Sequence, residues 1–212
     1  MERFISKRNQ VFLLDGVVVK QLPSSQHAKA ESGLLRKYHK AGVPVPKVLE
    51  QRDNEIVMEH ISGETIPDFL TRMQAEMDDA SLHKAAQGLC RWFEHFYEAV
   101  DHAQSGEIRG DVNGRNFIIT KDRVLSVDFE ERSFGTAEQD IGRFLAFIQT
   151  YDLRAGGFYR RYMGRHVKRR FGALFYHGIV KRLRLSKTEI VRQCWLERKA
   201  MRKRRSNCRP LI

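Results

Sequence analysis

The sequence lacks long hydrophobic runs, internal repeats and low-complexity tracts. Its longest apolar runs fall far below the ~20 residues that a membrane-spanning helix needs, and no signal-peptide pattern is present. The three cysteines, Cys90, Cys194 and Cys208, are odd in number and lack metal-ligand spacing, so we expect reduced thiols. The eight histidines form no paired metal-binding pattern. These absences predict a soluble, cytoplasmic protein.

Charge is distributed very unevenly along the 212 residues. Residues 151–212 contain 19 Lys and Arg residues against three acids, a local net charge of +16, whereas residues 1–150 sum to −4. An asymmetry of this size predicts an anionic partner for the C-terminal third. Hydrophobic residues make up 42% of the chain, which is enough to bury a sizeable core in one compact unit.

The basic third is predicted to be helical and to end in a charged helix. Residues 186–189, Ser-Lys-Thr-Glu, have the pattern of a capping box. Aromatic residues between the arginines are predicted to pack inward: Phe158, Tyr159, Tyr162, Phe171, Phe175 and Tyr176. The candidate anion contacts are Arg202, Lys203, Arg204 and Arg205. RNA phosphates or an anionic membrane surface would suit them, and a solvated basic face without a partner is the alternative.

A run of polar residues, RGDVNGRNFII, is followed by VDFE, whose aspartate stands seventeen residues after Asp111 and twelve after Asn116. Asp111 is placed to accept a hydroxyl proton, while Asn116 and Asp128 offer oxygen ligands to a metal. Two predicted strands, 117–119 and 124–127, form a hairpin that brings Asn116 near Asp128. This combination is typical of phosphoryl transfer, and the alternative is that the polar residues only form turns.

A second hairpin is predicted near the start of the chain. Strands 10–14 and 17–22 are joined by Asp15-Gly16, which places Lys20 on a β-branched strand. Apolar spacing predicts a helix over 27–41, and it carries Glu31 eleven residues after Lys20. The Lys20 strand resembles the one that carries the phosphate-binding lysine of the protein-kinase-like superfamily, and this resemblance implies that Lys20 pairs with Glu31. An ordinary surface lysine near an exposed glutamate is the alternative.

These motifs resemble the catalytic and metal-binding loops of the protein-kinase-like superfamily. Arg109 stands where that family has a histidine, and Glu130 replaces the glycine of its DFG-type triplet. Such departures look like the atypical and small-molecule branches, namely RIO kinases, the KEOPS-complex kinase, aminoglycoside phosphotransferases and lipopolysaccharide core kinases. The resemblance implies an α+β, two-lobed fold with a reduced N-terminal β lobe and a mainly helical C-terminal lobe.

The resemblance also implies ATP and magnesium as cofactors. Asp111 would be the catalytic base, Asn116 and Asp128 would bind magnesium, and Lys20 would hold the α and β phosphates with support from Glu31.

A buried strand over 56–63 would lead into an adenine-binding hinge at 58–62. There Met58 would be the gatekeeper, and the backbone of Glu59 and Ile61 would meet the adenine edge; the alternative is that Met58 and Ile61 are only core residues.

No G-x-G-x-x-G motif precedes Lys20, and only residues 1–9 precede the first predicted strand, so the phosphate-covering loop is expected to be short or absent. Asp140, at the start of a helix predicted over 138–151, would brace the catalytic loop or only cap its own helix.

We therefore expect a single kinase-like catalytic domain over residues 1–212, with an N-lobe at 1–61, a C-lobe at 63–185 and a basic helix and tail at 186–212. The leading hypothesis is an ATP- and magnesium-dependent phosphotransferase, an atypical serine/threonine kinase or ATPase that acts near RNA. One alternative is a small-molecule or lipopolysaccharide sugar kinase, peripheral to the inner membrane, and another is a non-catalytic pseudokinase or RNA-binding scaffold. The phosphoacceptor would be a protein or a saccharide, with Arg115 a candidate contact for a substrate phosphate.

Overall fold

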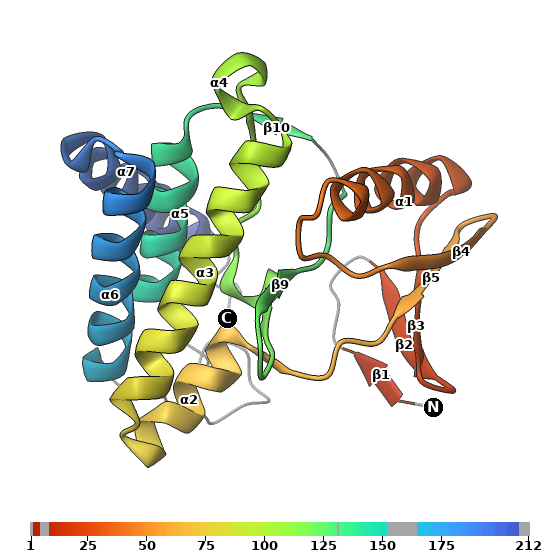
Figure 1. Ribbon diagram of the computed structural model, residues 1–212, viewed down its shortest axis with the longest axis horizontal. Coiled ribbons are helices and arrows are strands. Elements are labelled where there is room, and N and C mark those ends of the chain that lie inside the picture. Colours follow the sequence, from red (N-terminus) through yellow and green to blue (C-terminus); the bar gives the residue numbers. More distant parts are fainter. Residues whose placement is uncertain (1, 5–8, 131, 152–164, 208–212) are drawn as a thin grey trace.

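Two lobes make up the computed structural model, which describes residues 2–4, 9–130, 132–151 and 165–207. The N-terminal lobe holds an antiparallel sheet and one long helix, and the larger C-terminal lobe is mainly helical (Figure 1). The fold is therefore the α+β, two-lobed arrangement that the sequence predicts.

The sheet of the N-terminal lobe has the strand order β1-β2-β3-β5-β4, with every neighbouring pair antiparallel. Its strands are β1 (Glu2–Phe4), β2 (Gln10–Leu14), β3 (Val17–Gln21), β4 (Val48–Arg52) and β5 (Glu55–Glu59). Asp15 and Gly16 join β2 to β3 with φ angles of 48° and 81°, the left-handed values that a two-residue hairpin turn of type I′ requires. The hairpin predicted here is present, and a short strand that the sequence analysis did not predict, β1, pairs with β2.

Helix α1 (Ser25–Lys40) packs against this sheet. It begins two residues before its predicted start because the side chain of Ser24 accepts a hydrogen bond from the His27 amide and so caps the helix. The face turned to the protein interior carries Ala28, Leu35 and Tyr38. Glu31 is buried on the same face, which is an unusual place for a charge and points to a partner in the sheet.

The C-terminal lobe combines short strands with long helices. Its helices are α2 (Ile66–Glu76), α3 (Asp79–Ala99), α4 (His102–Ser105), α5 (Ala137–Thr150), α6 (Arg165–Leu183) and α7 (Lys187–Asn207), together with the 3-10 turn η1 (Gly114–Asn116). Its strands are β6 (Glu64–Thr65), β7 (Glu107–Ile108), β8 (Phe117–Ile119), β9 (Val124–Ser126) and β10 (Ser133–Phe134). β6, β8 and β9 form one antiparallel sheet, while β7 pairs with β10.

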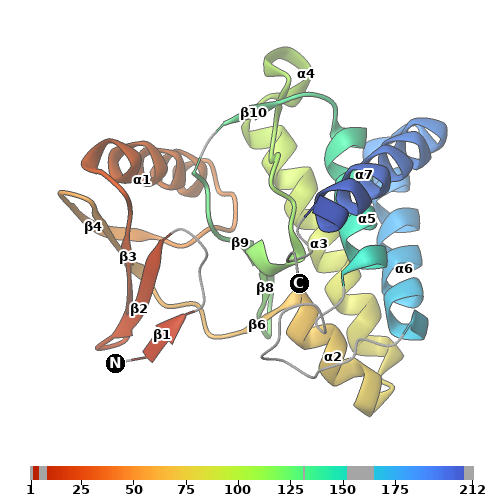
Figure 2. The same cartoon turned by 180° about the vertical axis from the view of Figure 1, so that it is seen from behind.

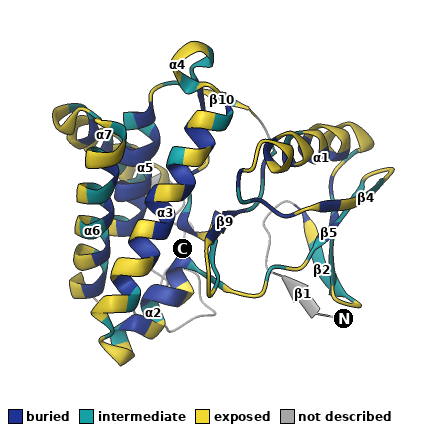
Figure 3. Cartoon of the chain, viewed as in Figure 1, coloured by how far each residue is buried: buried dark blue, intermediate teal, exposed yellow. Residues whose placement is uncertain are grey.

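An aromatic core fills the space between α3, α5, α6 and β8. Most of its rings pack edge-to-face or tilted, while Trp92 and Phe96 stack, and such ring pairs add to the burial of apolar area. The rings belong to Trp92, Phe93, Phe96, Phe117, Phe144 and Phe175. Figure 3 shows buried and exposed residues alternating along α3 and α6, as expected for helices with one face on the core. Phe117, the first residue of β8 and the neighbour of Asn116, is therefore anchored in this aromatic core.

The aromatic residues predicted to pack inward from the basic helices do so only in part. Phe171 and Phe175 are buried, whereas Tyr176 is only partly buried and the predictions for Phe158, Tyr159 and Tyr162 lie outside the described residues. Only half of the predicted capping box forms at α7. The Ser186 hydroxyl accepts from the Glu189 amide, but the Ser186 amide donates to Glu138 of α5 at 3.1 Å because α5 packs against the start of α7.

Cys90 and Cys194 are free and buried, as predicted for reduced thiols, and Cys208 lies outside the described residues. Among the helices that the structure describes, none has both the length and the apolar character needed to cross a membrane.

Gly142 allows α5 and α7 to approach at backbone distance. A β-carbon at this position would lie 2.6 Å from Gln193 Cβ and 2.8 Å from the Cys194 amide nitrogen. We expect Gly142→Ala to lower the free energy of unfolding by about 1–3 kcal/mol, because the two helices must move apart. Urea denaturation followed by circular dichroism measures the change.

Gly33 provides the matched control, since it lies in α1 with open space where a β-carbon would go. Gly33→Ala should raise the free energy of unfolding by about 0.5–1 kcal/mol, because alanine restricts the unfolded chain. Equal effects of the two substitutions would contradict close packing between α5 and α7.

Candidate active site

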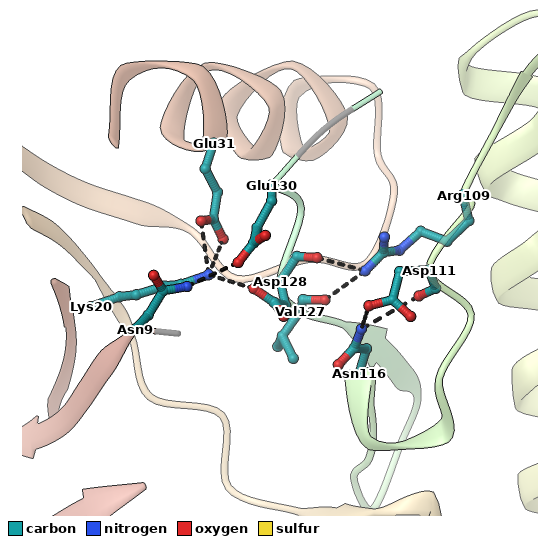
Figure 4. Close-up of polar contacts among 9 residues, drawn as sticks. All are labelled: Asn9, Lys20, Glu31, Arg109, Asp111, Asn116, Val127, Asp128 and Glu130. Carbon is teal, nitrogen blue, oxygen red and sulfur yellow. Dashed lines mark hydrogen bonds and ion pairs between the residues drawn. The ribbon is translucent and has the colours of Figure 1, made fainter. Parts of the chain in front are cut away.

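Polar side chains from both lobes converge at the junction between them (Figure 4). Lys20 Nζ on β3 lies 2.8 Å from both carboxylate oxygens of Glu31 on α1. The same ammonium lies 2.5 Å from Oδ1 of Asp128, which follows β9 in the C-terminal lobe. Lys20 thereby connects the sheet, the helix and the larger lobe through one positive charge.

The charges of this ion cluster are buried, so each is stable only while an oppositely charged partner lies close to it. Lys20 and Glu31 are only 5% and 1% exposed. Burial alone would lower the pKa of Lys20, but the charges of Glu31 and Asp128 outweigh it and raise that pKa above its ordinary value. Burial raises the pKa of Glu31, and the Lys20 ammonium opposes that shift. Removing one partner would leave an uncompensated buried charge, which is strongly destabilising.

Asp111 and Asn116 form the second part of the cluster. Asn116 Nδ2 donates to Asp111 Oδ2 at 2.9 Å, and the Asn116 carbonyl accepts from the Val127 amide. Asp111 is exposed whereas Asn116 is buried within η1, so the amide fixes a carboxylate that remains open to solvent. The side chain of Asn113 caps η1 by accepting from the Arg115 amide.

Arg109 supports the backbone on which Asp128 sits. Its Nη2 atom donates to the carbonyl oxygens of Val127 and Asp128, both at 2.8 Å, and its guanidinium lies 4.0 Å from the centre of the Phe129 ring. Asp128 has a φ of 68°, a left-handed conformation that costs energy for a residue with a side chain. The sequence analysis noted Arg109 only as a departure from histidine and missed this contact.

Asp140 braces the loop that carries Asp111. Its carboxylate accepts from the amides of Arg109 and Gly110 at 2.7 and 2.9 Å and from the Tyr97 hydroxyl at 3.0 Å. This favours bracing over the alternative that Asp140 only caps its own helix. Gly110 has a φ of 76°, and a β-carbon there would lie 2.1 Å from the Ser133 hydroxyl, so the loop requires glycine.

Glu107 on β7 is a further buried carboxylate that the sequence analysis did not identify. It accepts from the Tyr38 hydroxyl at 2.5 Å, from Lys37 Nζ at 3.2 Å and from Arg132 Nη2 at 2.6 Å. Helix α1 is thereby joined to the segments before Asp111 and after Asp128.

The residues predicted for the hinge lie where the chain crosses between the lobes. Met58 is buried in β5 opposite Val18, and the Glu59 amide donates to the Lys47 carbonyl at 3.0 Å. Ile61 is partly buried and follows the strand, which ends at Glu59 rather than continuing to residue 63. No contact in the structure tests the predicted roles of these three residues toward adenine.

The remaining candidate contacts belong to η1 and α7. Arg115 is exposed, and its guanidinium lies 5.8 Å from the Tyr151 ring. Helix α7 packs on α5, on the side of the larger lobe that faces away from the N-terminal sheet (Figures 1 and 2). It carries the exposed Arg202, Lys203 and Arg204, while the side chain of Arg205 lies outside the described part of the chain.

The oxygen donors at the lobe junction fit a magnesium ion only if a bound nucleotide supplies further ligands. Within the described residues, no three His, Cys, Asp or Glu side chains gather closely enough to hold a metal. Magnesium in proteins is often held by one or two carboxylates together with phosphates of a bound substrate. Asp128, whose side chain is 38% exposed, and the side-chain oxygen of Asn116 are ligands of that kind, so a metal here would need a nucleotide to complete its shell.

Comparison with known proteins places the chain among atypical kinase-like proteins. Residues 18–145 match the RIO1 family, described as the RIO domain. A "Probable serine/threonine-protein kinase BUD32 homolog" from Archaeoglobus fulgidus is 26% identical over 158 residues, covering 67% of this chain and 71% of that protein.

Two solved structures share the fold. They are a gentamicin complex of APH(2″)-IIa, with a TM-score of 0.54, and a streptomycin–ATP complex of the same protein, with a TM-score of 0.57. Each is 14% identical, and the alignments cover 83% and 85% of this chain and 77% and 80% of the others.

The contacts of Glu107 predict a pH-dependent stability. Burial opposes ionisation, but hydrogen bonds from Arg132, Tyr38 and Lys37 lower the pKa of Glu107 below its ordinary 4.5. A lowered pKa means that the ionised group stabilises the fold above pH 4.5 and that this contribution is lost as the pH falls through the lowered value. We expect Glu107→Gln to reduce the free energy of unfolding by about 1–3 kcal/mol at neutral pH.

The difference between wild type and Glu107→Gln should shrink as the pH falls below 4.5, which urea denaturation across a pH series measures. Glu50→Gln is the matched control, because Glu50 forms an exposed pair with Arg52 and should have little effect. A difference that stayed constant down to acid pH would argue against an ionised Glu107.

Proposed function

The chain belongs to the RIO domain family, and from this we propose that it is an ATP- and magnesium-dependent phosphotransferase, a serine/threonine kinase or ATPase that acts near RNA. One observation carries the proposal. The ion cluster of Lys20, Glu31 and Asp128 faces the hydrogen-bonded pair of Asp111 and Asn116, each group being of the type that phosphoryl transfer requires.

Each residue takes one role in the proposed reaction. Lys20, oriented by Glu31, binds phosphate oxygens, and Asp128 and Asn116 hold the metal. Asp111, exposed and fixed by the Asn116 amide, accepts the proton of the attacking hydroxyl or water. When bound, magnesium ATP supplies the phosphoryl group and neutralises its charge.

Met58, Glu59 and Ile61 are proposed to bind adenine at the lobe junction, and residues 1–212 are proposed to act as one catalytic domain. The segment that would hold a phosphate-covering loop includes residues 5–8, which lie outside the described residues. In the proposed site, Lys20 and the metal ligands order the substrate.

Helix α7 supports RNA as the anionic partner. Trp195 is 59% exposed, an unusual exposure for so large an apolar side chain, and Lys199 lies over its ring at 5.4 Å. Arg202, Lys203 and Arg204 follow on the same helix and are exposed. An accessible aromatic ring beside a row of cations is the combination that binds single-stranded nucleic acid through base stacking and phosphate contacts.

Asp111→Asn tests the proposed base. We expect magnesium-dependent ATP turnover to fall by about 10²–10⁴-fold while nucleotide binding is kept, because asparagine preserves shape but cannot accept the proton. Labelled phosphate release measures turnover, and calorimetry measures nucleotide binding. Asp53→Asn, in an exposed turn with a φ of 41° that asparagine tolerates, should leave both unchanged.

Retained turnover in Asp111→Asn would remove Asp111 from the base role. Nucleotide binding without turnover in the wild type would favour a non-catalytic scaffold. ADP release that depends on an added saccharide, rather than on protein or RNA, would favour a sugar kinase.

Arg202→Ala combined with Lys203→Ala tests the RNA partner. We expect RNA affinity to fall about tenfold and the salt dependence of binding to decrease by about one contact for each charge removed. Fluorescence anisotropy with a single-stranded oligonucleotide at several salt concentrations measures both. Lys29→Ala with Arg36→Ala removes two exposed cations from α1 and serves as the control. Binding to anionic vesicles without binding to RNA would favour a membrane surface.

A further inference from the structure

A second polar site lies in the C-terminal lobe, away from the ion cluster. A hollow of about 390 Å³ lies between α2, α3, the Ser62–Glu64 segment and the turn that joins β8 to β9. The described residues that line it include none of the five catalytic and metal-binding candidates at the lobe junction. We propose that this hollow binds a small anion that carries more than one phosphate group.

Small residues on one stripe of α3 create the hollow. Ser81, Ala85 and Gly88 lie along its floor, at the spacing of one helix face. A β-carbon on Gly88 would lie 3.0 Å from Val124 Cγ2, so glycine lets the helix approach β9 closely. At the opposite wall, a β-carbon on Gly63 would lie 2.5 Å from the Ile119 carbonyl oxygen. The walls are therefore fixed by backbone contacts.

The charge of the lining is opposite to that of the surrounding chain. Residues 1–150 contain 19 of the 38 Lys and Arg residues but 23 of the 26 acids, which makes this part of the chain acidic. The hollow nevertheless gathers five basic residues and two acids: Arg72, Lys84, Arg91, Lys121 and Arg123, with Glu64 and Asp122. A positive lining within an acidic region indicates a local requirement for cations.

Most of this positive charge is not neutralised inside the protein. Glu64 is engaged by Arg72 through contacts of 2.7 and 3.0 Å. The lining then has one remaining acid, Asp122, for its four other cations, which are Lys84, Arg91, Lys121 and Arg123. In the described part of the chain, neither Arg91 nor Arg123 has an acidic partner, so both guanidiniums are available to an external anion.

The turn that presents two of these cations is held in place before any ligand arrives. The Thr120 hydroxyl accepts from the amides of Asp122 and Arg123 at 3.3 and 3.1 Å. Lys84 Nζ donates to the Lys121 carbonyl at 2.9 Å, which ties α3 to the turn. Because hydrogen bonds already hold the backbone of this turn, little backbone freedom is lost when an anion binds, and this favours affinity.

The lining also indicates what kind of anion fits. Phe69 is buried, and its ring offers no open face for a nucleobase to stack on. Recognition therefore depends on charge and hydrogen bonding, and several separated cations suit a ligand with several phosphates better than a single phosphate. The β8–β9 hairpin separates this hollow from Asn116 and Asp128 by strands of three residues, about 10 Å. The proposal does not depend on phosphotransferase activity.

Calorimetric titration with inorganic tripolyphosphate at low salt tests the proposal. We expect Arg91→Ala with Arg123→Ala to weaken binding by at least about tenfold, because two charge-assisted hydrogen-bonding groups are lost. Lys121→Glu, an exposed change within the turn, should weaken it as well. Lys29→Ala with Arg36→Ala, which removes the same charge from α1, should bind as the wild type does.

Lys20→Met combined with Glu31→Gln removes the ammonium together with the buried charge that it neutralises, and this double variant should keep tripolyphosphate binding. Loss of binding in this double variant together with retention in Arg91→Ala/Arg123→Ala would place the anion at the lobe junction and overturn the proposal. Equal affinity for inorganic monophosphate, or binding of a single-stranded RNA but not of tripolyphosphate through Arg91 and Arg123, would also overturn it. Absence of tripolyphosphate binding in the wild type would have the same consequence.

Discussion

The buried ammonium of Lys20 is the constraint on which the arrangement of the two lobes depends. A charge this deeply buried is tolerated only when opposite charges approach closely, because the alternative is an unpaired ion in a medium of low dielectric constant. Glu31 and Asp128 supply those charges from α1 and from the segment after β9. The position of the helix over the sheet and the junction between the lobes are therefore set by the same electrostatic requirement.

Buried charge also organises the loops around Asp111. Asp140 binds the backbone just before Asp111, and Arg109 binds the carbonyls of Val127 and Asp128. Glu107 connects the segments that carry these residues to α1. Each of these groups is satisfied by several hydrogen bonds, which is the condition under which a buried polar network adds rigidity. The aromatic core lies directly behind the network, so the exposed carboxylate of Asp111 stands on a rigid base.

The sequence was sufficient where short-range rules decide the structure. The Asp15-Gly16 turn, the hairpin of β8 and β9 and the amphipathic α5 follow from patterns within a few residues. Strand β1 was missed because three residues show no alternation that can be distinguished from chance. Glu107 and Arg109 were missed for another reason: their partners lie up to 70 residues away, and no local pattern encodes such a contact. The lining of the hollow likewise comes from segments that only the fold brings together.

The short contact between Lys20 and Asp128 has a thermodynamic consequence. An internal cation already occupies Oδ1 of Asp128. An external cation that binds this oxygen competes with the ammonium for it, and an anion that attracts the ammonium weakens its contact with the oxygen. Cation and anion binding at the lobe junction are therefore linked, and each raises the affinity of the other by the same factor.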